Sequence, residues 1–167
     1  MQFSNFPVLQ TQRLTLRRFE NKDFSAYFSL HQDSSVYPFI TDKGPLGESS
    51  IRQKIQRNRD TYLEGNHLYW VAALTISNQF LGYIAAHDIS DSAILSYAVL
   101  TEHQRRGFMT EALQEVIRFL FSQGLSAIEA RTHLENTAST ALLISMGFER
   151  MQDDNARMVF RLSAPKR

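Results

Sequence analysis

The sequence predicts an α/β (α+β) protein in which a mostly antiparallel central sheet is flanked by helices. Helix-like and strand-like segments alternate along all 167 residues, and no repeat, low-complexity tract or linker separates them. In the middle of the chain, three apolar strand-like runs are separated only by the polar breaks SNQ and SDS. Strands joined this closely are antiparallel, because parallel neighbours need a long crossover. We therefore expect residues 1–167 to form a single domain.

The N-terminal third contains one strand and two helices. The alternating run RLTLRRF, residues 13–19, predicts a strand whose leucines face opposite to Arg17. A helix that starts near Asn21 or Asp23 follows, because apolar residues recur at i, i+3, i+4 and i+7. These residues are Phe24, Tyr27, Phe28 and His31. The loop DKGPLGES opens a second helix, whose apolar face is Ile51, Ile55, Tyr62 and Leu63.

The remaining elements follow in a regular order. The three central strands are expected at residues 68–76, 80–89 and 93–100. A helix over Thr110–Gln123 comes next, with Gly124 as its C-terminal stop. Its apolar face is Ala112, Leu113, Val116, Ile117, Leu120 and Phe121. A strand over residues 127–134, a short helix over residues 137–146 and a last strand over residues 157–162 complete the chain.

Composition excludes several functional classes. The chain has 18 basic and 17 acidic side chains, and this balance argues against a nucleic-acid partner. It has no cysteine, which excludes disulfides, thiolate nucleophiles and cysteine-ligated zinc. The N-terminus lacks the pattern of a signal peptide, and no apolar run reaches the roughly 18 residues of a membrane span. We expect a cytoplasmic protein without a membrane partner, either a monomer or a homodimer.

The segment TEHQRRGFMTEAL places two arginines and a glycine between a strand and a helix. The first turn of a helix presents unpaired backbone N–H groups at the positive end of the macrodipole. A glycine lets the backbone curl inward and lets a ligand approach closely. This order of elements is suited to a pyrophosphate, although a solvated surface loop or a nucleic-acid patch are alternatives. Near-zero net charge and the lack of a stacking platform disfavour the nucleic-acid patch.

A second segment, LENTASTALLISMGFE, places Asn136 at the start of the next helix and Ser139 three residues later. Together these motifs resemble the GNAT superfamily of N-acetyltransferases. QRRGFMTEAL resembles its acyl-CoA-binding signature, and IEARTHLENTASTALLISMGFE is similar to its following strand and helix. LQTQRLTLRRFENKDF resembles the start of the RimJ/RimL-type branch, which acetylates protein N-termini. The resemblance covers nearly the whole chain and implies a splayed central sheet and acetyl-CoA as co-substrate, without a metal.

The resemblance also implies a set of site residues. Those that would hold the pyrophosphate are Gln104, Arg105, Arg106, Gly107, Phe108, Met109 and Thr110. The backbone that would bind the pantetheine arm and the thioester carbonyl belongs to Tyr97, Ala98, Val99 and Leu100. Asn136 would hydrogen-bond the pantetheine, although a plain helix N-cap is the alternative. Leu143 stands where many members carry a tyrosine acid, whereas Ser139 matches a serine typical of the RimJ/RimL-type branch. Ser139 would donate a proton to the thiolate or hold a water that does so.

The general base is expected among the carboxylates and imidazoles. Glu129 ranks first, because a mid-strand place among apolar neighbours would make it a stronger base. His87 and Asp88 are alternatives, whereas Glu102 and His103 are expected to point to solvent.

Aromatic residues are the candidate acceptor contacts. Tyr37 and Phe39 are expected in the loop between the first two helices, where loops commonly carry specificity. Tyr69, Trp70 and Tyr97 either line an acceptor slot or belong to the core.

These features predict direct transfer of an acetyl group to a primary amine, without a covalent enzyme intermediate. The expected acceptor is a protein N-terminal α-amine of the ribosomal-protein type. A polyamine, an amino acid or an aminoglycoside is an alternative acceptor. A non-catalytic acyl-CoA-binding module is the alternative function, since the tyrosine acid is missing and the segment after Phe148 is short.

Overall fold

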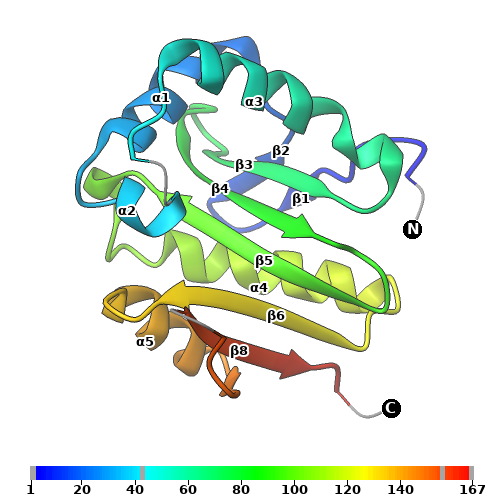
Figure 1. The fold of residues 1–167 in the computed structure, drawn as a ribbon. Helices are drawn as coiled ribbons and strands as arrows, with labels where there is room; N and C mark the ends of the chain where they lie inside the picture. The colour runs from blue at the N-terminus through cyan, green and yellow to red at the C-terminus, as the bar shows by residue number, and fades with distance from the viewer. Residues whose placement is uncertain (1–2, 42–43, 155–156, 166–167) are drawn as a thin grey trace.

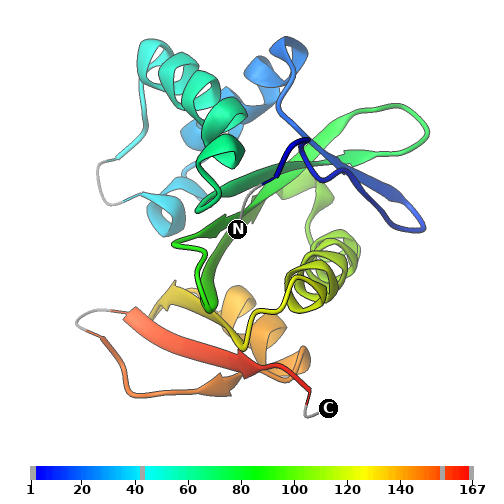
Figure 2. The same cartoon turned by 90° about the vertical axis from the view of Figure 1, so that its right-hand side faces the viewer.

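The computed structural model describes residues 3–41, 44–154 and 157–165, and these form an eight-stranded sheet with helices on both faces (Figures 1 and 2). The strands are β1 (Leu9–Gln10), β2 (Leu14–Arg17), β3 (Leu68–Leu74), β4 (Phe80–His87), β5 (Ser92–Val99), β6 (Ala127–His133), β7 (Glu149–Arg150) and β8 (Arg157–Ser163). Their order in the sheet is β1-β2-β3-β4-β5-β6-β8-β7. Within the described sheet every neighbouring pair is antiparallel except β5 and β6. This confirms the predicted fold class.

The helices pack on the sheet through two separate apolar clusters. The helices are α1 (Phe24–Gln32), α2 (Tyr37–Ile40), α3 (Glu48–Asp60), α4 (Phe108–Ser122) and α5 (Thr137–Ser145). Three short 3₁₀ turns are η1 (Asn21–Asp23), η2 (Thr61–Glu64) and η3 (Thr101–His103). Tyr27 of α1 and Ile51 of α3 pack with Val71 on one face. Leu113 of α4 and Leu143 of α5 belong to the cluster on the other face. Burial of these apolar surfaces holds the layers together.

The sheet opens into a wedge between its two parallel strands. The β5–β6 ladder runs from Ser92↔Ala127 to Leu95↔Ala130 and stops there. Both strands continue beyond that point, but they diverge, as Figure 1 shows at the left ends of β5 and β6. The opposite edge of β5 stays paired with β4 as far as Gly82↔Val99. The backbone edge of β5 that faces the wedge is therefore left without a neighbouring strand.

Two local predictions were wrong. The segment Tyr37–Ile40 forms the short helix α2 rather than a loop. Leu63 is 59% exposed, because α3 ends at Asp60 and the following 3₁₀ turn changes the helical periodicity. Arg17, on the other face of β2 from the leucines, is buried as well. It forms two hydrogen bonds to Asp23, from Nη1 at 2.8 Å and from Nη2 at 2.9 Å, and this partner makes its burial tolerable.

His31 of α1 is fully buried, and neither ring nitrogen has a hydrogen-bond partner among the described residues. Burial, with a smaller effect of Lys54, lowers the pKa of His31 from 6.5 to about 4. The unfolded chain therefore takes up a proton near pH 6.5 that the folded protein does not accept until about pH 4.

We expect this difference to destabilise the protein in mild acid. The free energy of unfolding should fall by up to about 3 kcal/mol as the pH drops from 6.5 to 4, in addition to the effects of other groups. His31→Phe, which keeps a ring of similar size, should remove this part of the slope. Urea denaturation of both proteins between pH 4 and pH 7 measures the difference. Equal slopes for the two proteins would contradict the prediction.

None of the helices within the described residues is long and apolar enough to cross a membrane.

Candidate active site

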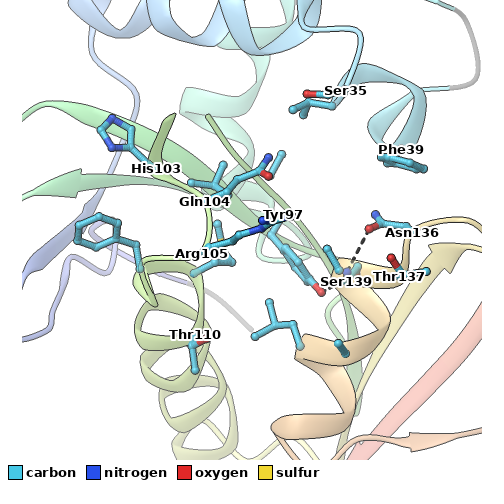
Figure 3. Close-up of a pocket in the computed structure, with 18 of the residues that line it drawn as sticks. Ser35, Phe39, Tyr97, His103, Gln104, Arg105, Thr110, Asn136, Thr137 and Ser139 are labelled. Atoms are coloured by element: carbon cyan, nitrogen blue, oxygen red, sulfur yellow. Dashed lines mark hydrogen bonds between the residues drawn. The ribbon is translucent and has the colours of Figure 1, made fainter. Parts of the chain in front are cut away.

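The wedge contains a cavity of about 710 Å³, here called the long cavity. Most residues predicted to bind the cofactor line it, namely Tyr97, Ala98, Val99, Gln104, Arg105, Gly107, Phe108, Met109, Thr110 and Asn136. Ser139 and Phe39 line it as well, so β5, α2 and the starts of α4 and α5 meet at one site (Figure 3). Among its described lining residues there is no carboxylate.

The turn before α4 presents a concave row of backbone donors. Arg105 and Gly107 both have left-handed backbones, with φ of 58° and 76°. The first hydrogen bond of α4 runs from Glu111 N to Gly107 O at 3.1 Å. The N–H groups of residues 108–110 therefore have no acceptor within the described backbone. Unpaired donors at a helix N-terminus, beside Gln104 and Arg105, fit a phosphate group.

Arg13, the residue before β2, stabilises this turn through side-chain contacts. Its Nε donates to Glu111 Oε2 at 2.6 Å, and its Nη1 donates to the carbonyl of Arg106 at 3.0 Å. Its guanidinium also lies 4.4 Å from the centre of the Phe108 ring. Burial opposes ionisation of Glu111, but hydrogen bonds from Thr11 and Arg13 lower its pKa below the ordinary value. The turn is thus fixed before any ligand binds.

A tyrosine and a serine meet on the wall nearest to α5. The hydroxyl of Tyr97 lies 2.7 Å from Ser139 Oγ. Ser139 N donates to Asn136 Oδ1 at 3.1 Å, so Asn136 caps α5 with its oxygen while it lines the cavity (Figure 3). Burial raises the pKa of Tyr97 to about 12, although the bond to Ser139 acts in the opposite direction. Tyr97 therefore carries its proton at neutral pH.

The position in α5 where the resemblance leads us to expect a tyrosine is occupied by Leu143. Leu143 is 1% exposed and belongs to the apolar core, so it presents nothing to the cavity. Tyr97 instead supplies a phenol from β5 to the same wall.

A second cavity of about 230 Å³ is here called the basic cavity. It shares five lining residues with the long cavity, namely Phe39, Ile40, Tyr97, Asn136 and Ser139. Its further polar lining residues are Lys54, Tyr69, Tyr83, His87, Ser96, Arg131, Thr132 and Arg157. None of the described residues that line it is an aspartate or a glutamate. The two cavities thus adjoin each other at the Tyr97–Ser139 pair and at α2.

Burial lowers the pKa of two basic groups in this second cavity. Burial, followed by the charge of His67, lowers the pKa of His87, while Asp88 opposes and Lys54 assists. Nε2 of His87 lies 2.8 Å from Ser96 Oγ. Burial, followed by Arg57, lowers the pKa of Lys54. His87 is therefore neutral at pH 7 and is able to accept a proton.

Several predicted site residues lie elsewhere. Glu129 sits in the paired part of β6, opposite Ile94, before the wedge opens. It accepts a hydrogen bond from Arg161 Nη1 at 3.1 Å, and it is absent from both cavity linings as the described residues define them. Leu100 is buried and donates its N–H to Leu81 O at 2.9 Å.

The side chains of Arg106 and Tyr37 are also absent from both described linings. Arg106 is exposed, and its guanidinium lies 5.4 Å from the Phe108 ring centre.

His103 was expected at the surface, and that prediction was wrong. It is 9% exposed, its ring lies 6.3 Å from that of Phe108, and it lines the long cavity. Its ring nitrogens have no partner among the described residues. Glu102 and Asp88 are exposed and line neither cavity within the described part of the chain. Trp70 belongs to the core, where its Nε1 donates to Pro7 O at 2.7 Å.

The basic residues Lys54, Arg131 and Arg157 were not among the predicted site residues. Lys54 had a signal, since it lies three residues after Ile51 and one before Ile55, at the border of the buried face of α3. Arg157 enters the site because its strand pairs with β6 at His133. Nothing local in the sequence specifies that pairing. No group of three or more potential metal ligands occurs in the part of the chain that the structure describes.

Three comparisons with known proteins agree on one family. Residues 13–149 match the family model described as the acetyltransferase (GNAT) domain. The uncharacterized N-acetyltransferase YoaA of Bacillus subtilis is 32% identical over 152 residues, which cover 87% of this chain and 84% of that protein. Mycobacterium smegmatis RimJ in complex with CoA-disulfide has a TM-score of 0.85 at 21% identity, over 98% of this chain and 90% of RimJ. RimL, the ribosomal L7/L12 alpha-N-protein acetyltransferase in complex with coenzyme A, has a TM-score of 0.81 at 15% identity, over 94% of this chain and 98% of RimL.

Proposed function

This chain belongs to the GNAT acetyltransferase family and is an acyltransferase, and we propose that residues 1–167 act as one catalytic domain that acetylates protein N-terminal α-amines with acetyl-CoA. The observation that carries the proposal is the meeting of the two cavities at the Tyr97–Ser139 pair. One cavity ends at a phosphate-binding turn, and the other holds a neutral imidazole. Two substrates bound in these cavities would therefore meet beside this pair.

The long cavity would hold the acyl donor in an extended form. Residues 104–110 would bind the pyrophosphate through the free N–H groups of α4 and the side chains of Gln104 and Arg105. The unpaired backbone edge of β5 at residues 97–99 would bind the pantetheine arm and the thioester carbonyl. Acetyl-CoA supplies the activated acyl group. Fixing both reactants in this way contributes up to roughly 7–11 kcal/mol to lowering the barrier.

The reaction needs two proton movements. A bond forms between the amine nitrogen and the acyl carbon, and the carbon–sulfur bond breaks with its electron pair on sulfur. Ser139 donates a proton to that sulfur, and Tyr97 replaces it through their 2.7 Å contact. His87, directly or through water, accepts the proton that the amine loses. Glu129 has no part in this scheme, because its carboxylate pairs with Arg161.

The choice of a protein N-terminus is supported by the resemblance of the chain to the RimJ/RimL-type branch. RimL is named for the alpha-N-acetylation of a ribosomal protein, and RimJ shares the same fold. A free amino acid is the alternative acceptor, and the test must distinguish it from a peptide N-terminus.

Release of free thiol from acetyl-CoA tests this function against a panel of acceptors. The panel contains peptides with free Ser, Ala or Met N-termini, the same peptides with blocked N-termini, free amino acids and polyamines. Turnover that requires a free peptide N-terminus is the expected result. Turnover on free amino acids alone would replace the proposed acceptor. Coenzyme A binding without turnover on any amine would favour the non-catalytic module.

Removing either hydroxyl of the acid pair should slow turnover without weakening donor binding. We expect Tyr97→Phe and Ser139→Ala each to lower kcat about 10²-fold, because each breaks the same route of proton donation to sulfur. The double variant should be no slower than the slower single one. Tyr62→Phe, a phenol outside both cavities, is the matched control. Unchanged kcat in Tyr97→Phe would show that the contact is structural only.

A further inference from the structure

The charges of the basic cavity indicate which kind of acceptor it could bind. Its described lining contains Lys54 from α3, His87 from β4, Arg131 from β6 and Arg157 from β8, and it contains no carboxylate. Four elements distant in the sequence thus contribute basic side chains to one small space. A cavity of one charge sign attracts ligands of the opposite sign.

Lys54 is the least compensated of these charges. Among the described ion pairs none involves Lys54, whereas Arg131 lies 3.5 Å from Asp154. The groups that interact electrostatically with Lys54 are themselves basic, namely Arg57, His31 and His87. A half-buried ammonium group among other bases is unfavourable in the empty protein. An anion bound beside it would relieve that cost.

The size of the cavity limits what it can hold. A volume of about 230 Å³ corresponds to roughly seven or eight water molecules, at about 30 Å³ each. That space suits a group of the size of one amino-acid residue. A long polyamine would bring further positive charges to a wall that already carries several, which disfavours it as an acceptor.

We propose that the acceptor carries an anionic group within a few bonds of its reacting amine, and that Lys54 and Arg131 bind this group in the basic cavity. The inference rests on the proposed function, since it assigns the basic cavity to the acceptor. The anion has two chemical sources, an acidic second residue of a peptide or the α-carboxylate of a free amino acid. Both would place the amine toward Tyr97 and Ser139, which line both cavities.

Matched acceptors test the proposal by binding rather than by turnover. Calorimetric titrations of the CoA-saturated protein use the peptide amides Ser-Asp-Phe, Ser-Asn-Phe and Ser-Lys-Phe, and, in a second arm, serine and serinamide. We expect the aspartate peptide to bind at least about tenfold more tightly than the asparagine peptide, with the lysine peptide weakest. Preference for serine over serinamide, without a preference among the peptides, would identify the free amino acid as the source.

Variants of Lys54 test whether this residue causes the preference for the acidic probe. Lys54→Met should abolish the preference for the acidic probe and leave the affinity for the neutral probe unchanged, and Lys54→Arg should restore part of the preference. Lys22→Met removes an exposed lysine of η1 that pairs with Glu20, and it is the control expected to keep the preference.

The proposal is wrong if the acidic and neutral probes bind equally in both arms, if none binds measurably, or if Lys54→Met weakens all probes alike. Failure of the proposed function looks different, because it appears as absent CoA binding or absent thiol release with every acceptor. A protein that acetylates neutral and basic N-termini as readily as acidic ones would retain its function and lose only this specificity.

Discussion

Glutamate in place of Gly107 should weaken acetyl-CoA binding by about 10³-fold or more. Gly107 has φ of 76°, a conformation that side chains rarely adopt, and a Cβ there would lie 3.4 Å from Arg13 Nη2. The new carboxylate would also occupy the positive end of α4 and use the N–H groups that a phosphate needs. Loss of two charge-assisted hydrogen bonds, at about 1.5–3 kcal/mol each, corresponds to this factor.

The control places the same substitution at the other end of the same helix. Gly124 follows the last turn of α4, also has a left-handed backbone with φ of 96°, and a Cβ there would meet no described atom within 4 Å. Gly124→Glu carries the same charge and backbone strain but lies away from the cavity. Calorimetric titration with acetyl-CoA, with circular dichroism to verify folding, compares the two variants. Equal dissociation constants for the two would refute the role of the turn.

Replacement of Arg17 by leucine should lower the free energy of unfolding by about 3–5 kcal/mol. Asp23, its partner, is 1% exposed and accepts both guanidinium hydrogen bonds as well as the N–H of Glu20 at 2.7 Å. Without Arg17 that carboxylate would lie buried with its charge uncompensated. The pair joins β2 to the start of α1, so its loss should also loosen the face that carries α1 and α3.

Two further variants separate the buried pair from a general effect of arginine. Arg150 makes an equally bidentate contact with Asp153, but at the surface. Arg150→Leu should therefore leave the urea midpoint unchanged within error. The double variant Arg17→Leu with Asp23→Leu should recover much of the stability lost in the single variant, because it removes both charges. A single variant as stable as the parent protein would disprove the assignment.

The parts of the fold that depend on short-range pattern could be predicted from the sequence. The polar breaks SNQ and SDS correctly predicted that β3, β4 and β5 are antiparallel, since no crossover fits between them. The apolar face of α4 was also predicted correctly. The helix itself starts at Phe108, two residues before the predicted start. The two-residue strands β1 and β7 were missed, because segments so short show no periodicity.

The motifs predicted many residues that line the site, but not the contacts between separate segments. Gln104 and Gly107 lie three positions apart in one motif, and both line the long cavity. The contact between Tyr97 and Ser139 spans 42 positions and depends on how β5 faces α5, so it could not be predicted. Glu129 shows how a neighbouring strand changes the surroundings of a residue. Its mid-strand position indicated burial, but Arg161 on the neighbouring strand β8 takes up its charge.

The divergence of β5 from β6 has a consequence for solubility as well as for catalysis. An unpaired strand edge usually invites a strand of another molecule to add to it, which leads to aggregation. Here the open edge lies inside the sheet, between β6 on one side and the paired β4 on the other, with α5 beside it. The outermost strands of the described sheet, β1 and β7, each have only two residues, so they present few unpaired backbone groups to a strand of another molecule. The unpaired edge of β5 is therefore open to the long cavity but shielded from strand addition by other molecules.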